Sequence, residues 1–146
     1  MKTIKYLAIG LLFIGMTALF GCKKEDKIAK NLWKKGGEWN IEKFQNNYSF
    51  GSGSNSVVLN DAGTYEFDKD GSGKVTLNEG NQTYTNLFTY ENTDNSLSLT
   101  FKEGQLYTAG TKEKYTLDWE KDKVNLYSYV SDANGYDEYL IDLKKK

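Results

Sequence analysis

The chain has 146 residues, and its composition alone excludes several classes of protein. It has no histidine, no arginine, no proline and one cysteine, which excludes imidazole catalysis, internal disulfides and Cys/His metal sites. After residue 21 it carries 17 lysines and 20 acids, so the formal charge there, 17 − 20 = −3, argues against nucleic-acid binding. The aromatic residues of that part suffice for one core, and we expect a single monomeric domain that is not an enzyme and holds no cofactor.

The first segment has the features of a secretory signal. Lys2 and Lys5 precede an uncharged run from Tyr6 to Phe20. At 15 residues this run is shorter than the roughly 18 residues of a membrane-spanning helix, whereas a basic start and a short apolar run are typical of a cleaved signal. We therefore expect residues 1–21 to be removed.

The apolar run ends in Leu19-Phe20-Gly21-Cys22, which resembles the lipobox of bacterial lipoproteins. Phe20 departs from the small residue that is usual at that position. The resemblance implies that the Cys22 thiol receives a diacylglycerol, that the signal is cut before it and that the new amino group is acylated. Several acyl chains such as palmitate give stable attachment, because each buried methylene contributes about 0.8 kcal/mol. The alternative is a secreted protein with one stray thiol.

A charged stretch from Lys23 to Lys27 comes next and contains no apolar residue. It predicts a solvated tether, so that residues 22–31 join the lipidated cysteine to the domain. Within it, Lys24-Glu25-Asp26 resembles the export signal of surface lipoproteins of the Bacteroidetes, a lysine followed by an acidic pair. This resemblance implies attachment to the outer membrane and leaves exposure at the cell surface open.

Residues 32–146 predict one domain of antiparallel strands. Before it, the apolar residues between Ile28 and Trp33 fall on one face of a short helix, which Gly36 and Gly37 end. Nearly every later segment alternates with period two, and turn residues separate the segments at hairpin spacing. The predicted strands are residues 38–45, 56–60, 63–68, 73–78, 82–91, 96–102, 112–119, 123–130 and 136–143.

One face of these strands is consistently large and apolar, and the other is polar. No predicted helix is long enough to cover a sheet, so eight or nine strands with one buried face favour an up-and-down barrel. A two-layer sandwich is the alternative, because alternation alone does not separate the two. The predicted inward residues are Trp39, Ile41, Tyr65, Phe67, Val75, Leu77, Tyr84, Phe88, Tyr90, Leu97, Leu99, Phe101, Tyr115, Leu117, Trp119, Val124, Leu126, Tyr139, Ile141 and Leu143.

The first predicted strand opens with Gly37-Glu38-Trp39, which resembles the G-x-W motif that begins lipocalin barrels. Residues 63–73, 95–99, 115–117 and 139–143 are similar in order and spacing to the lipocalin-like lipoproteins of the Bacteroidetes. In lipocalins an arginine near the last strand covers the motif tryptophan, and here Lys144 or Lys145 is expected to replace it by a cation-π contact. The resemblance implies a barrel that binds a small apolar or amphipathic molecule, with Gly37 and Trp39 structural at its closed end.

Residues Asp68 to Glu79 nearly complete an EF-hand calcium loop, in which Asp68, Asp70 and Ser72 are weak metal candidates. An EF-hand needs flanking helices, whereas residues 63–67 alternate like a strand. Asp and Gly suit a hairpin turn, and a strand through Glu79 would carry its carboxylate about 20 Å from that turn. We therefore predict a hairpin and no metal site.

Carboxylates give no sign of catalysis. Glu42, Glu66, Asp118 and Asp142 fall on the predicted solvent face, whereas a catalytic pair of carboxylates must meet in a cleft. We interpret these residues as solubilising groups on the outside of the sheet.

Polar residues with inward parity, that is, at positions where the period-two alternation turns the side chain toward the apolar face, are candidates for ligand contacts. Asn86 and Ser128 lie among inward aromatics and need partners. Trp119 belongs to no motif and is expected in the open part of the interior, and the predicted ligand pocket comprises Trp119, Asn86, Tyr84 and Phe88. Two alternatives stand beside it. These aromatics form ordinary core, or the filled barrel or sandwich is an interaction module that binds a protein or a glycan.

Overall fold

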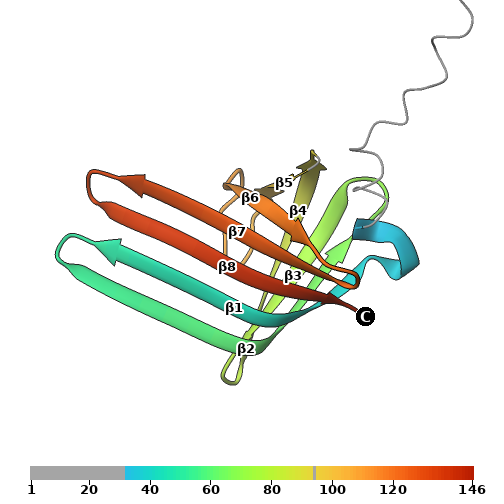
Figure 1. Cartoon of the computed structure of the whole chain (residues 1–146), viewed down its shortest axis with the longest axis horizontal. Helices are drawn as coiled ribbons and strands as arrows, with labels where there is room; N and C mark the ends of the chain where they lie inside the picture. Colours follow the sequence, from blue (N-terminus) through green and yellow to red (C-terminus); the bar gives the residue numbers. More distant parts are fainter. Residues whose placement is uncertain (1–31, 94) are drawn as a thin grey trace, which may run out of the picture.

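In the computed structural model, which describes residues 32–93 and 95–146, the alternating segments form eight antiparallel strands (Figure 1). Each strand pairs with the next, and β8 pairs with β1, so the sheet closes into a barrel. The predicted all-β, up-and-down barrel is confirmed, and the sandwich is excluded. The strands are β1 (Glu38–Phe50), β2 (Gly53–Phe67), β3 (Ser72–Glu79), β4 (Gln82–Asn92), β5 (Ser96–Phe101), β6 (Lys112–Trp119), β7 (Lys123–Asp132) and β8 (Gly135–Lys145).

Two predicted strands, residues 56–60 and 63–68, are parts of the single strand β2. Asp61 between them has a φ of 48°, and the register of β1 against β2 shifts between Ile41 and Lys43. A bulge of this kind bends a strand without ending it. The polar residues that signal a turn at this point therefore mark a bend.

The segment before β1 contains one turn of 3-10 helix, η1 (Lys34–Gly36). The predicted helix from Ile28 to Trp33 lies mostly outside the described residues, of which Leu32 and Trp33 are helical. Gly37 has a φ of 67°, and a Cβ on it would lie 2.0 Å from the carbonyl oxygen of Phe67. Glycine is therefore required where this segment turns onto the barrel. Within residues 32–93 and 95–146, no helix is long and apolar enough to cross a bilayer.

The predicted inward face fills the barrel. Tyr84, Trp119 and Tyr139 are only half-buried, and the other predicted inward residues are buried. Asn86 and Ser128 are buried polar residues, as their parity predicted, with 1% and 5% of their surface exposed. The bulkiest part of this core is a chain of ring contacts that joins Tyr65, Phe67, Phe88, Tyr90 and Phe101.

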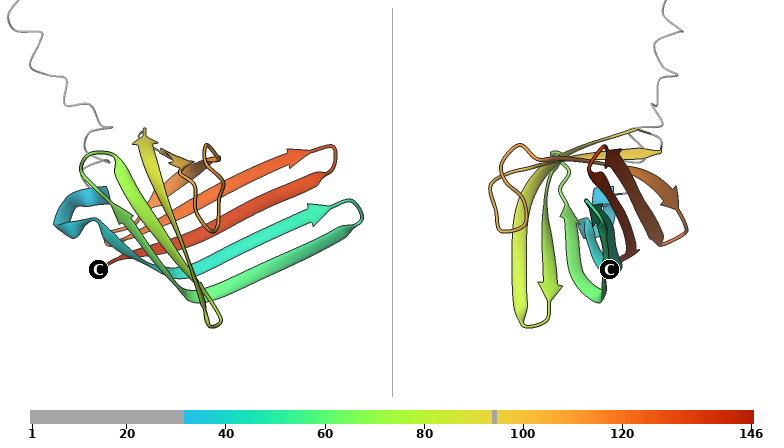
Figure 2. Two further views of the ribbon diagram at one scale, coloured as in Figure 1. Left: turned by 180° about the vertical axis from the view of Figure 1, so that it is seen from behind. Right: turned by 90° about the vertical axis from the view of Figure 1, so that its left-hand side faces the viewer.

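Two long hairpins, β1-β2 and β7-β8, extend well beyond the other strands (Figures 1 and 2). β3 pairs with β2 only from Gly63 to Phe67, and β6 pairs with β7 only from Val124 to Tyr127. Beyond these points β2, β1, β8 and β7 form a four-stranded sheet. This sheet is one wall of the barrel opening.

The turn between β2 and β3 confirms the hairpin prediction. The Asp68 N–H donates to the Ser72 carbonyl oxygen over 2.8 Å, and Gly71 has a φ of 84°. The Ser72 hydroxyl donates to Asp70 over 2.6 Å. Glu79 ends β3 at the opposite end of the barrel, so the twelve-residue EF-hand arrangement is not formed. In the described part of the chain, no group of three or more His, Cys, Asp or Glu residues is placed to hold a metal ion.

Candidate functional site

A cavity of about 250 Å³ lies at the end of the barrel where the β3-β4 turn and the β5-β6 loop meet the long hairpins. Its walls are mainly aliphatic and aromatic, and the polar lining residues besides three tyrosines are Asn46 and Glu79. The volume is just below the roughly 300–1,000 Å³ of sites for drug-sized ligands, so the cavity suits a smaller molecule. It is lined by Ile41, Phe44, Asn46, Val57, Leu59, Tyr65, Val75, Leu77, Glu79, Leu106, Tyr107 and Tyr139.

The β5-β6 loop folds back along β4 over this cavity (Figure 2). Tyr107 of the loop stacks on Phe101, with ring centroids 3.9 Å apart and planes 9° from parallel. Leu106 and Tyr107 both face the cavity. The loop thus supplies an aromatic cover that the strands alone do not provide.

Asn86 holds the loop in this position. Its amide nitrogen donates to the carbonyl oxygens of Lys102 (2.9 Å) and Tyr107 (3.1 Å). Its amide oxygen accepts from the backbone N–H groups of Leu106 (2.7 Å) and Tyr107 (3.2 Å). Gly104 packs so closely that a Cβ there would lie 2.3 Å from the Asn86 side chain. All four hydrogen bonds of the amide are therefore made within the protein.

We expect Asn86→Ala to lower the free energy of unfolding by about 2–4 kcal/mol, because four hydrogen bonds to the loop are lost at a buried site. Urea unfolding followed by tyrosine and tryptophan fluorescence measures the change. Asn81→Ala, in the exposed β3-β4 turn, is the matched control and should change stability little. An Asn86→Ala protein as stable as the control would contradict the role of Asn86 as a clamp.

A cluster of phenols lies at the base of the cavity. Tyr65, Tyr107 and Tyr139 line it, and buried Tyr115 lies beside them with only 1% of its surface exposed. Burial raises the pKa of Tyr139 to about 12, and it raises the pKa values of the other three phenols as well. The four hydroxyls therefore stay protonated at any physiological pH.

We call the cavity of about 250 Å³ the mouth cavity, because it lies at the open end of the barrel. The four residues of the predicted ligand pocket do not come together around it. Asn86 uses its hydrogen bonds on the loop, and Phe88 is fully buried in the core. Tyr84 is half-exposed on β4 and bonds to Gln82. Trp119 lies at the other end of the barrel, because it is the last residue of β6.

Several lining residues were not singled out by the sequence. Phe44 and Val57 lie beyond the bulge in β1 and β2, where the alternation changes phase. Leu106 and Tyr107 belong to an irregular loop, which carries no periodic signal.

The closed end of the barrel is built around Trp39, which is 3% exposed. Its indole N–H donates to the Leu32 carbonyl oxygen over 2.9 Å, and the Lys145 ammonium lies 4.5 Å from the centre of its ring. The predicted lysine cover of this tryptophan is thus confirmed for Lys145. Trp119 meets Trp39 edge to face, with centroids 6.1 Å apart.

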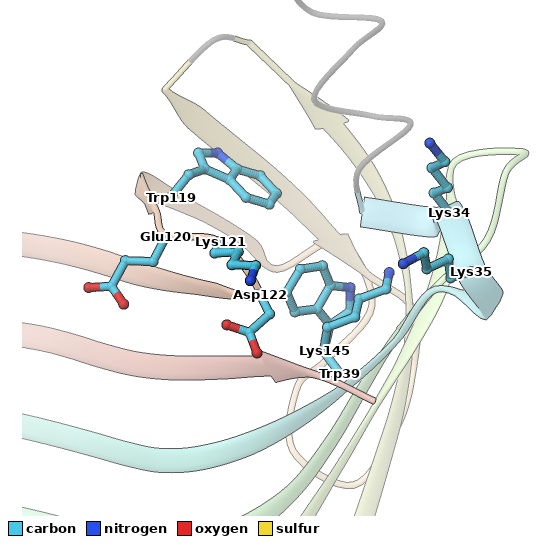
Figure 3. Close-up of a pocket in the computed structure, with 8 residues that line it drawn as sticks. All are labelled: Lys34, Lys35, Trp39, Trp119, Glu120, Lys121, Asp122 and Lys145. Atoms are coloured by element: carbon cyan, nitrogen blue, oxygen red, sulfur yellow. The ribbon is translucent and has the colours of Figure 1, made fainter.

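A second hollow of about 360 Å³ lies beside these two tryptophans (Figure 3). Lysines from three segments surround it, and the Glu120 carboxylate points away from it (Figure 3). Its lining is Lys34, Lys35, Trp39, Trp119, Glu120, Lys121, Asp122 and Lys145. This hollow is basic, whereas the mouth cavity has Glu79 as its one charged lining residue among those the structure describes.

The four carboxylates predicted on the outer face do not gather in a cleft. Glu42 pairs with Lys123 (2.7 Å) and Lys144 (3.5 Å), and the hydrogen bond from Lys123 lowers the pKa of Glu42. Glu66 pairs with Lys74 at 2.9 Å. Asp118 is exposed and Asp142 is partly exposed. Surface pairs of this kind contribute little to stability and supply no acid-base pair.

No family model matches the chain, and no curated protein matches it. Among solved structures, the crystal structure of an uncharacterized protein from Bacteroides eggerthii is similar to it. The two share 12% sequence identity with a TM-score of 0.45, over 73% of this chain and 96% of that one.

Proposed function

We propose that the chain is a lipid-anchored lipoprotein of the bacterial envelope whose barrel binds a small apolar or amphipathic molecule in the mouth cavity. One observation carries the proposal: the interior is filled at the closed end, yet it leaves an apolar cavity of about 250 Å³ under a loop at the open end. Small-molecule sites in barrels commonly lie at the mouth. No catalytic role is proposed for any residue.

The lipid anchor is supported by the lipobox-like sequence that ends at Cys22, which lies outside the described residues. Residues 1–21 would be removed and residues 22–31 would tether the barrel to the outer membrane. The lipocalin-like relationship is supported by Gly37-Glu38-Trp39 at the start of β1 and by Lys145 over Trp39. Together these features support the proposal of a carrier held at a membrane surface.

Blocking the cavity tests ligand binding. Val57 lines the cavity, whereas its neighbour Val58 faces outward with 49% of its surface exposed. We expect Val57→Trp to fill the cavity and to weaken binding of 1-octanol at least about tenfold, while Val58→Trp leaves it unchanged. Calorimetric titration of the full chain in detergent measures both, and circular dichroism checks that each variant is folded. Equal binding by the two variants would place the ligand elsewhere.

The alternative function is a surface interaction module that binds a protein or a glycan. It is favoured by exposed apolar residues on the projecting sheet, where Phe50 is 80% and Val130 is 64% exposed. In addition, the first half of β2 has no partner on its outer side among the described strands. If no small molecule binds in the cavity, this projecting sheet becomes the leading candidate.

A further inference from the structure

The hollow of about 360 Å³ beside Trp39 and Trp119, which we call the basic hollow, collects lysines from distant parts of the chain. These lysines come from η1, from the β6-β7 turn and from the end of β8, and they are Lys34, Lys35, Lys121 and Lys145. Two acids, Glu120 and Asp122, also line the hollow, so four lysines against two acids leave a formal excess of two positive charges. The basic hollow therefore attracts anions.

Three of these lysines are not neutralised by the protein itself. Lys34, Lys35 and Lys121 are exposed, and none of them forms a salt bridge with a residue that the structure describes. By contrast, Lys144 on the outer face of β8 pairs with Glu42 at 3.5 Å. The ammonium groups of the three lysines are thus available to a ligand.

Lys35 has a backbone conformation that suits other residues better. Its φ of 58° and ψ of 44° lie in the left-handed region, which glycine and asparagine adopt more readily than lysine does. Its side chain extends toward Lys145 (Figure 3). Burial lowers the pKa of Lys145, and the nearby charge of Lys35 lowers it further. Backbone strain is concentrated at functional sites, and a bound anion would relieve the repulsion between these two lysines.

The backbone around the basic hollow is fixed by hydrogen bonds. The Lys145 N–H donates to the Asp122 carbonyl oxygen over 2.8 Å, which joins the end of β8 to the β6-β7 turn. Within that turn the Glu120 N–H donates to the Lys123 carbonyl oxygen over 3.0 Å. Lys121 is therefore presented by a short, hydrogen-bonded turn. A site built in this way needs little ordering when a ligand binds.

We infer that the basic hollow binds a phosphate group with two negative charges, which is held by the ammonium groups of Lys35 and Lys121 beside the charge of Lys145. Lysine binds phosphate as a point charge and does not need the fixed geometry of an arginine fork. A doubly charged phosphate matches the excess of two positive charges, whereas a carboxylate or a phosphodiester carries only one negative charge.

Two sources carry such a phosphate, the head group of a membrane lipid and a soluble phosphate ester. The start of the described chain favours the lipid. The Leu32 carbonyl oxygen accepts from the Lys145 ammonium over 3.2 Å, so the chain enters the barrel at this end. Residues 22–31 span at most about 36 Å from Cys22 to Leu32. The preference for a lipid, unlike the phosphate site itself, rests on the proposed anchor at Cys22.

A series of phosphate probes tests the inference and separates the two sources. The full chain in non-ionic detergent is titrated by calorimetry at about pH 7.5, where a phosphate monoester is close to doubly charged. The probes are dioctanoyl phosphatidic acid, dioctanoyl phosphatidylcholine and glycerol 3-phosphate. We expect phosphatidic acid to bind at least about tenfold more tightly than phosphatidylcholine, which has no net charge. Weaker binding of glycerol 3-phosphate than of phosphatidic acid supports the lipid source, and equal binding supports the soluble ester.

Lys35→Asn/Lys121→Gln identifies the residues responsible. This double variant should weaken binding of phosphatidic acid at least about tenfold, because two charge-assisted hydrogen bonds are lost. Its melting temperature should stay equal or rise, since asparagine suits the left-handed conformation at position 35. Lys112→Gln/Lys114→Gln is the matched control. It removes two exposed lysines from the part of β6 farther from Trp119 and should change binding by less than about twofold.

Three results would overturn the inference: neither phosphate monoester binds, phosphatidic acid and phosphatidylcholine bind equally, or the Lys35→Asn/Lys121→Gln variant binds like its control. Val57→Trp separates this site from the proposed ligand site in the mouth cavity. It should leave phosphate binding unchanged, because Val57 does not line the basic hollow. Loss of phosphatidic acid binding in Val57→Trp would place the lipid in the mouth cavity and contradict the inference.

Discussion

Trp39→Ala should unfold the barrel or lower its melting temperature sharply. Trp39 is 3% exposed, and it connects the segment before β1 to the end of β8 through Leu32 and Lys145. It also packs edge to face against Trp119. Truncating a buried tryptophan typically costs about 3–5 kcal/mol, which is a large share of the roughly 5–15 kcal/mol that stabilises a small domain.

The measurement is urea unfolding of wild type and two variants. Trp33→Ala is the matched control, because Trp33 is half-buried at the edge of the closed end and contacts Lys69 across 5.5 Å. Trp33→Ala should lower the free energy of unfolding much less than Trp39→Ala does. A Trp39→Ala protein with near wild-type stability would contradict the closed end as described, since the register of β1 is what buries this side chain.

Cys22→Ser should abolish lipidation and release the protein from membranes. Cys22 is the single thiol in the chain, and it stands where a lipobox places the acylated residue. Several acyl chains hold a protein at a bilayer almost irreversibly, whereas the stretch from Lys23 to Lys27 carries only charged residues and adds no apolar anchor. Metabolic labelling with a fatty-acid analogue, followed by fractionation, measures both losses.

The control restores a thiol at another position. In Cys22→Ser/Ser52→Cys, the new cysteine lies in the exposed β1-β2 turn, and we expect neither label nor membrane attachment. A label that persists in Cys22→Ser would show that the lipid anchor has been assigned to the wrong residue. Replacing Lys24, Glu25 and Asp26 with alanine distinguishes export from anchoring, because only surface exposure should fall.

The barrel itself could be predicted, because the alternation of apolar and polar residues along a strand indicates which side chains are buried. Residues such as Leu97, Leu99 and Phe101 repeat with period two, and each is buried in the structure. The interpretation of residues 68–72 as a turn also followed from local chemistry, since Gly71 needs a positive φ and Asp70 bonds to Ser72. Both features depend on short-range rules that the sequence states directly.

The cavity could not be predicted, because it depends on distances that alternation does not encode. Asn86 has the same inward parity whether it contacts a ligand or clamps a loop, and only the position of residues 102–107 decides between these roles. Trp119 also has inward parity, but this parity does not say at which end of the barrel the residue lies. That depends on where β6 ends, and Trp119 is its last residue. The bulge at Asp61 changes the phase of the lining residues beyond it.

The most direct test of ligand binding is a crystal structure of the protein saturated with 1-octanol. The account predicts electron density for the octyl tail inside the mouth cavity, in contact with Leu59 and Leu106 below the loop that Asn86 holds. An empty or side-chain-filled cavity in protein that calorimetry shows to be saturated would contradict it, and so would a tail bound on the outer surface of the barrel.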